Sequence, residues 1–66
     1  MNIIINGKTY EIPEASTLQD ALDMANVKPQ GIATALNNHV VTADMRPKTV
    51  LADGDRIVII TAFYGG

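Results

Sequence analysis

Two segments of the sequence, one near each end, are apolar at successive positions. Met1 to Ile5 is rich in β-branched residues, and the segment 56–64 is the longest β-prone stretch of the chain. Successive side chains of a strand point to opposite faces, so a segment that is apolar on both faces is typical of a strand in the middle of a sheet. The second segment alternates between Ile57, Ile59 and Phe63 on one face and Val58, Ile60 and Tyr64 on the other. We therefore expect these two segments to be the central strands.

A tight turn follows the first of these strands. Asn6-Gly7 supplies the two positive φ values of a type I′ turn, and Tyr10 and Ile12 then alternate with polar residues. This pattern predicts a β-hairpin at the start of the chain.

One amphipathic helix is predicted after the hairpin. Ser16-Thr17 offers an N-cap, and Asp20 stands three residues after Thr17, as in a capping box. Asn26 can close the helix, and Pro29 forbids its continuation. Apolar residues recur at helical spacing, at Leu18, Ala21, Leu22 and Ala25. We expect this face of the helix to pack on one face of the sheet.

A second hairpin is predicted in the middle of the chain. Ile32 to Leu36 reads as a strand, Asn37-Asn38 tolerates left-handed backbone, and Val40-Val41 begins a short partner strand. The irregular segment 42–52 is expected to be a loop with one helical turn. Asp53-Gly54-Asp55 then predicts a tight turn into the last strand. Four apolar side chains of the intervening segments are expected to fill the core, namely Met24, Met45, Val50 and Leu51.

The order of these elements defines the expected fold. Because a helix lies between the first and last strands, the two central strands should be parallel, with a right-handed crossover. This arrangement is an α+β, ubiquitin-like β-grasp, with a mixed sheet and one main helix packed on one face. We expect residues 1–66 to form a single domain, with 65–66 as a flexible C-terminal diglycine tail.

Composition narrows the classes of function. The chain has 66 residues and no cysteine, so a disulfide framework and a thiolate zinc site are both excluded. Its net charge is −2, and no run of Lys or Arg offers the basic stripe that nucleic-acid binding requires. No segment has the length of a signal peptide or a membrane span, so we expect a cytoplasmic protein.

The residues that could carry chemistry are few. His39, the single histidine, lies beside the Asn37-Asn38 turn and is expected to be an exposed hairpin residue. Asp53 and Asp55 resemble part of a calcium loop, but the later oxygen ligands are missing, so a turn is the better interpretation. The sequence therefore predicts neither an enzyme nor a bound cofactor or metal.

The C-terminal sequence is the remaining unusual feature. A long apolar strand ends in Phe63, Tyr64, Gly65 and Gly66. The two glycines could be an incidental, loose terminus. They could equally form a thin tether, because residues without a Cβ can pass down a narrow channel into the active site of another protein. A terminal carboxylate activated by ATP could then accept sulfur as a thiocarboxylate.

Over its whole length the chain resembles the ThiS family, the sulfur carrier proteins of thiamine biosynthesis, and more distantly the small subunit of molybdopterin synthase. The resemblance rests on the segments 35–41 (ALNNHVV) and 51–59 (LADGDRIVI) and on the final Gly65-Gly66.

The resemblance implies a series of partners. A ThiF-type, E1-like enzyme would adenylate Gly66 with ATP, sulfur from a cysteine-derived persulfide would replace AMP, and a ThiG-type thiazole synthase would receive the sulfur. Gly65 would allow the tail to pass into those partners. Apolar residues of the open sheet face, with Phe63 and Tyr64 among them, would dock both enzymes, although these two side chains could instead cap the core.

Two alternatives remain open at the level of sequence. The chain could be the molybdopterin synthase subunit or a related sulfur carrier, which shares the fold, the diglycine and the activation chemistry. It could also be a β-grasp interaction domain that carries no sulfur and whose glycines are incidental.

Overall fold

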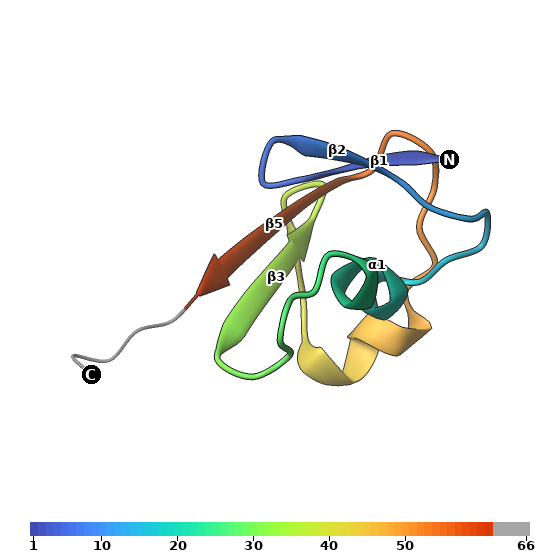
Figure 1. The fold of residues 1–66 in the computed structure, drawn as a ribbon. Helices are drawn as coiled ribbons and strands as arrows, with labels where there is room; N and C mark the ends of the chain where they lie inside the picture. Colours follow the sequence, from blue (N-terminus) through green and yellow to red (C-terminus); the bar gives the residue numbers. More distant parts are fainter. Residues whose placement is uncertain (62–66) are drawn as a thin grey trace.

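The computed structural model describes residues 1–61, and within that range five strands form one mixed sheet in the order β2-β1-β5-β3-β4. The strands are β1 (Asn2–Ile5), β2 (Lys8–Glu11), β3 (Ile32–Leu36), β4 (His39–Val41) and β5 (Arg56–Thr61). β1 and β5 are parallel, and the other pairs are antiparallel. The helix α1 (Leu18–Met24) and the 3-10 helix η1 (Ala43–Lys48) lie on the same side of the sheet (Figure 1).

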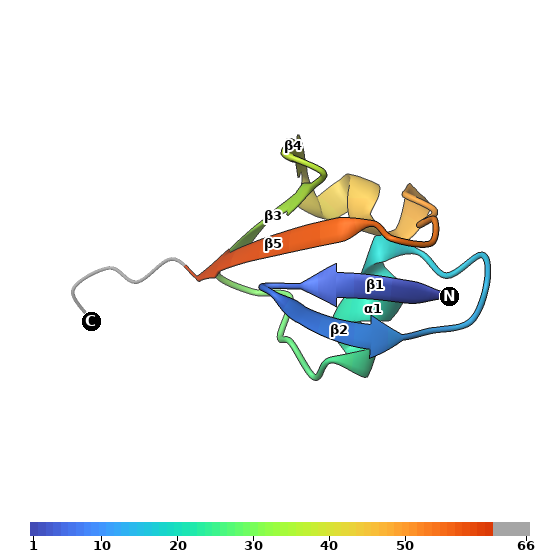
Figure 2. The ribbon, with the colours of Figure 1, turned by 90° about the horizontal axis from the view of Figure 1, so that it is seen from above.

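Both doubly apolar segments form central strands, as predicted. β1 lies between β2 and β5, and β5 lies between β1 and β3 (Figure 2). The last three residues of the β-prone stretch, 62–64, lie outside the described range, so the prediction is confirmed only to Thr61.

The two asparagine-led turns have the predicted backbone. Asn6 and Gly7 have φ values of 48° and 82°, and Asn37 and Asn38 have φ values of 48° and 71°. Both residues of a type I′ turn need positive φ, and asparagine accepts this conformation more readily than other residues with a Cβ. The first turn joins β1 to β2, and the second joins β3 to β4.

Caps at both ends define the helix α1. The Thr17 hydroxyl accepts a hydrogen bond from the Asp20 N–H, and the Asp20 carboxylate accepts one from the Thr17 N–H, which together form a capping box. At the other end, Asn26 has a φ of 59°, and the N–H of Val27 donates to the carbonyl of Leu22. These contacts form a Schellman motif, so side chains and turn geometry satisfy the helix ends.

The core lies between this helix and one face of the sheet. The expected helix residues Leu18, Ala21 and Leu22 are buried, and Ala25 is half-buried. Leu18 and Ala21 form one cluster with buried side chains from the sheet and the loops, and Ala25 packs against it; the other members are Ile3, Ile5, Ile12, Leu51 and Ile57.

Three of the four apolar residues expected to fill the core do not do so. Met24, Met45 and Val50 are 43%, 45% and 62% exposed, whereas Leu51 is buried. Val50 forms an isolated backbone bridge with Thr17, and alternation along an extended segment turns its side chain outward when that of Leu51 points inward. Met24 and Met45 lie in short helices whose buried faces are formed by other residues.

A buried arginine anchors η1 to the sheet. Arg46 is 3% exposed, and its guanidinium donates to the Thr34 hydroxyl at 3.1 Å and to the carbonyls of Ile32 and Pro29 at 3.0 and 3.3 Å. The Thr34 hydroxyl in turn donates to the carbonyl of Val41. The helical turn predicted within the loop 42–52 is thus the six-residue 3-10 helix η1, which this polar cluster holds in place.

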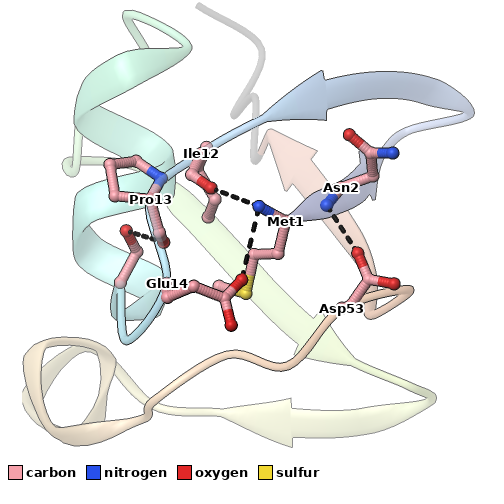
Figure 3. A network of polar contacts seen from close by, with 7 residues as sticks. Met1, Asn2, Ile12, Pro13, Glu14 and Asp53 are labelled. Atoms are coloured by element: carbon pink, nitrogen blue, oxygen red, sulfur yellow. Dashed lines mark hydrogen bonds and ion pairs between the residues drawn. The ribbon is translucent and has the colours of Figure 1, made fainter.

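The start of β1 is tied to two loops (Figure 3). The Met1 ammonium donates to the Ile12 carbonyl at 2.8 Å and lies 3.4 Å from the Glu14 carboxylate. The Asn2 N–H donates to the Asp53 carboxylate at 2.7 Å. These contacts hold the loop that leads into β5 against the first strand. No helix within residues 1–61 is long and apolar enough to cross a membrane.

Candidate functional site

The residues predicted to carry the function follow the end of β5. Phe63, Tyr64, Gly65 and Gly66 all lie outside the described residues. The structure therefore describes the part of the molecule that precedes these residues. This part consists of β5 and the protein surface around it.

β5 is held by β3 up to its last described residue and by β1 over its first residues only. On one side it pairs with β3 from Leu36↔Ile57 to Ile32↔Thr61. On the other side it pairs with β1 at Ile4↔Arg56 and Ile5↔Ile57. The strand is thus paired within the sheet, through β3, as far as Thr61, five residues before Gly66.

Each type I′ turn also binds β5 through its first asparagine. The Asn6 carboxamide accepts from the N–H of Ile59 at 2.7 Å and donates to the carbonyl of the same residue at 3.2 Å. The Asn37 carboxamide accepts from the Arg56 N–H and donates to the Asp55 carboxylate, both at 3.0 Å. The sequence predicts only a turn at each asparagine, because contacts to residues 53 and 19 positions away leave no local pattern.

The face of the sheet opposite α1 is open and is apolar over β3, β4 and β5 from Val58 onward, whereas Thr9, Glu11 and Arg56 lie on the same face near Ile4. In Figure 2, α1 lies behind β1 and β2, so the view looks onto this face. Strand pairing places a set of small and branched side chains on it, which we call the open face: Ile4, Ala33, Ala35, Val40, Val58 and Ile60. Val58, Ile60 and Val40 are 39%, 61% and 79% exposed. Ile60 lies on β5 next to Thr61, so the apolar surface reaches the base of the tail.

The sequence offered a signal for this open face. The sequence predicts one long helix, which can cover only one face of the sheet. Because the central strands are apolar on both faces, the other face is expected to be apolar and uncovered. A contiguous exposed apolar surface is typical of an interaction site.

The other candidate residues have structural roles. The Nδ1 atom of His39 lies 3.0 Å from the Asn37 carbonyl in an exposed hairpin, as predicted. The Asp55 carboxylate accepts from the Ala52 N–H and from Asn37, and that of Asp53 accepts from Asn2. Gly54 has a φ of 86°, so the interpretation of this segment as a turn is confirmed. Residues 1–61 enclose no pocket and contain no group of three or more side chains that could hold a metal ion.

Comparison with known proteins agrees with this geometry. The sequence model of the ThiS family matches residues 3–66. The sulfur carrier protein ThiS of Escherichia coli (strain K12) is 24% identical over 66 residues, which cover 100% of both chains. The crystal structure of the thiamine biosynthesis protein (ThiS) from Geobacter metallireducens matches with a TM-score of 0.82 at 26% identity, over 100% of this chain and 99% of that one. The solution NMR structure of a thiamine biosynthesis protein from the same organism gives a TM-score of 0.78 at 26% identity, over 100% and 88%.

The mixed sheet with one main helix on one face is a ubiquitin-like β-grasp, which confirms the fold expected from the sequence. The chain belongs to the ThiS family. Members of this family are sulfur carrier proteins and not enzymes, in agreement with the prediction that the chain has no catalytic activity of its own.

Proposed function

We propose that this chain carries sulfur for thiamine biosynthesis as a thiocarboxylate on Gly66. The observation that carries the proposal is the family match, which extends from residue 3 to residue 66 and so includes the diglycine. The position of β5 supports it, because this strand is paired with β3 as far as Thr61, the last described residue, and five residues can span at most about 17 Å from that point. The tail is therefore long enough to enter an active site while the domain stays outside.

The chemistry requires two partners to act on the carboxylate. A Gly66 oxygen attacks the α-phosphorus of ATP in a ThiF-type enzyme, and pyrophosphate leaves. The terminal sulfur of a cysteine persulfide on the donor then attacks the acyl carbon, and AMP leaves. A thiol attacks the donor-side sulfur of the resulting acyl disulfide and releases the thiocarboxylate, leaving a disulfide behind. The chain has no cysteine, so both the persulfide and the thiol belong to partners.

The open face is the proposed docking surface for the ThiF-type enzyme and for a ThiG-type thiazole synthase. It is apolar, exposed and continuous with the strand that leads to Gly66. Phe63 and Tyr64 are proposed to extend it toward the partners, and Gly65 is proposed to let the tail pass. One surface for both enzymes would make activation and delivery successive, because the two partners could not bind at the same time.

The test is the mass of the intact protein after incubation with ATP, the ThiF-type enzyme and a persulfide donor. The expected product has one oxygen replaced by sulfur, and the modification should map to Gly66. A variant with one alanine appended after Gly66 is the matched control and should remain unmodified. Sulfur on another residue, or an unmodified native chain, would reject the carrier function. Transfer to a molybdopterin synthase large subunit in place of a thiazole synthase would assign the carrier to the alternative pathway.

A further inference from the structure

β5 is paired over different lengths on its two sides. The ladder with β3 continues to Thr61, whereas the ladder with β1 ends at Ile5↔Ile57. Figure 1 shows the consequence, since the last part of β5 runs past the β1–β2 hairpin with β3 alone beside it.

Asn6 closes the shorter ladder. Its N–H donates to the Ile57 carbonyl at 3.0 Å, and its carboxamide makes two hydrogen bonds with the backbone of Ile59. The side chain thus replaces the next backbone rung. At the same residue the chain turns toward Gly7 and β2, so β1 does not accompany β5 further.

The backbone groups of Thr61 point to this unaccompanied side. In a strand, the N–H and C=O groups of alternate residues point the same way, so Thr61 faces the same side as Ile59, whose partner is Asn6. Among residues 1–61, no strand lies on this side of β5 at Thr61, whereas β3 pairs with it on the other side. An unpaired N–H and C=O pair on a fixed strand is a template for a strand of another protein.

The outer edges of the sheet are less suited to such pairing. β2 carries the exposed charged side chains of Lys8 and Glu11, and β4 has three residues. Charges and short length are the usual protections of edge strands. From Ile57 to Thr61, by contrast, β5 carries no charged side chain, and Ile60 is 61% exposed on the adjoining open face.

We propose that the adenylating partner adds an extended segment of its own backbone to the free edge of β5 at Thr61. This inference rests on the proposed function and adds a mode of recognition to it. Pairing through the main chain would hold the base of the tail in one direction and register, whatever side chains follow it. Apolar contacts on the open face would hold the domain on the enzyme. Pairing at the edge of β5 would direct the residues after Thr61 toward the active site.

The proposal can be tested by removing a single N–H. A chemically synthesised chain with an ester in place of the Ile60–Thr61 amide lacks the Thr61 N–H but keeps its side chain. Thr61→Pro removes the same donor, and Thr61→Ala is the matched control that keeps it. Because the Thr61 N–H points away from β3, both changes should leave the β3–β5 ladder intact, which the amide chemical shifts of Ala33 and Ile60 would verify.

The expected result is a loss of about tenfold in kcat/KM for thiocarboxylate formation with the ester and with Thr61→Pro, which is the effect of one interfacial hydrogen bond. Thr61→Ala should stay within about twofold of the native chain, since it keeps the backbone donor. In hydrogen-exchange measurements, the Thr61 amide should exchange rapidly in the free protein and become protected when the ThiF-type enzyme is bound without ATP.

Three outcomes would overturn the proposal. The ester and Thr61→Pro could react as fast as the native chain, the Thr61 amide could stay unprotected in the complex, or sedimentation could show that the edge pairs with a second copy of this chain. Failure of the carrier function would look different, because the native chain would gain no sulfur. The exchange measurement needs no sulfur transfer and would still decide whether the edge is bound.

Discussion

The two faces of the sheet are built from similar residues but have opposite surroundings. On the covered face, Ile3, Ile5 and Ile57 are 0–5% exposed beneath α1. On the open face, Ile60 and Val40 are 61% and 79% exposed, although they are as apolar. Along β5 the two environments alternate from one residue to the next. Neighbouring residues of β5 therefore serve different purposes: those on the covered face stabilise the fold, and those on the open face are available to partners. Substitutions on the two faces should have different effects.

The largest expected effect on stability is on the covered face. Ile57→Ala removes a fully buried side chain from the core and should lower the free energy of unfolding by about 3 kcal/mol. A domain of this size has a total stability near 5 kcal/mol, so the variant should be close to unfolding at 37 °C. Urea denaturation followed by circular dichroism measures the loss, with Ile57→Val as the control at about 1 kcal/mol. A loss below 1 kcal/mol for the alanine variant would show that Ile57 is not central to the core.

The polar anchor of the covered side should have the next largest effect. Arg46→Met removes three hydrogen bonds from a buried guanidinium and should lower stability by about 2 kcal/mol. Arg46→Lys keeps the charge but not the planar set of donors, and it should fall between methionine and the native residue. Thermal unfolding of the three proteins checks the order. A methionine variant more stable than the native chain would mean that desolvation of the cation outweighs its bonds.

The open face should behave in the opposite way. Ile60→Ser should change stability by about 0.5 kcal/mol or less, because the side chain is largely exposed. Its affinity for the ThiF-type enzyme should fall by about tenfold, or 1.4 kcal/mol, if the open face is the docking surface. Val50→Ser is a matched control, since Val50 is 62% exposed but lies outside the open face. Equal binding by both variants and the native chain, measured by calorimetry, would place the docking surface elsewhere.

The smallest effect is expected in the connection that leads into the covering helix. Ala15 has a φ of 66°, a conformation that is costly for a residue with a Cβ. Ala15→Gly should therefore raise stability by up to about 1 kcal/mol, with partner binding unchanged because Ala15 lies outside the open face. A rise in the urea midpoint at constant slope is the expected signature. A clear loss of stability would indicate that the methyl group makes a contact worth more than the strain.

The sequence was sufficient for the elements whose ends are defined by local chemistry. Positive φ at Asn6-Gly7 and Asn37-Asn38, and the cap at Thr17, depend on neighbouring residues and can be recognised from spacing alone. The exposure of Met24 and Met45 could not be predicted in this way, because hydrophobicity does not say which side of a short helix faces the core. The bonds from Asn6 to Ile59 also escaped prediction, since they join residues 53 positions apart. The site residues Phe63 to Gly66 lie outside the described range and remain predictions.

Sulfur on Gly66 can be measured by tandem mass spectrometry of the C-terminal peptide after reaction with ATP, the ThiF-type enzyme and a persulfide donor. We expect a thiocarboxylate on Gly66 in the native chain, and none when one residue follows Gly66. Ile60→Ser should give the same product more slowly. An unmodified Gly66 in a folded chain bound to the active enzyme would show that this residue does not carry sulfur.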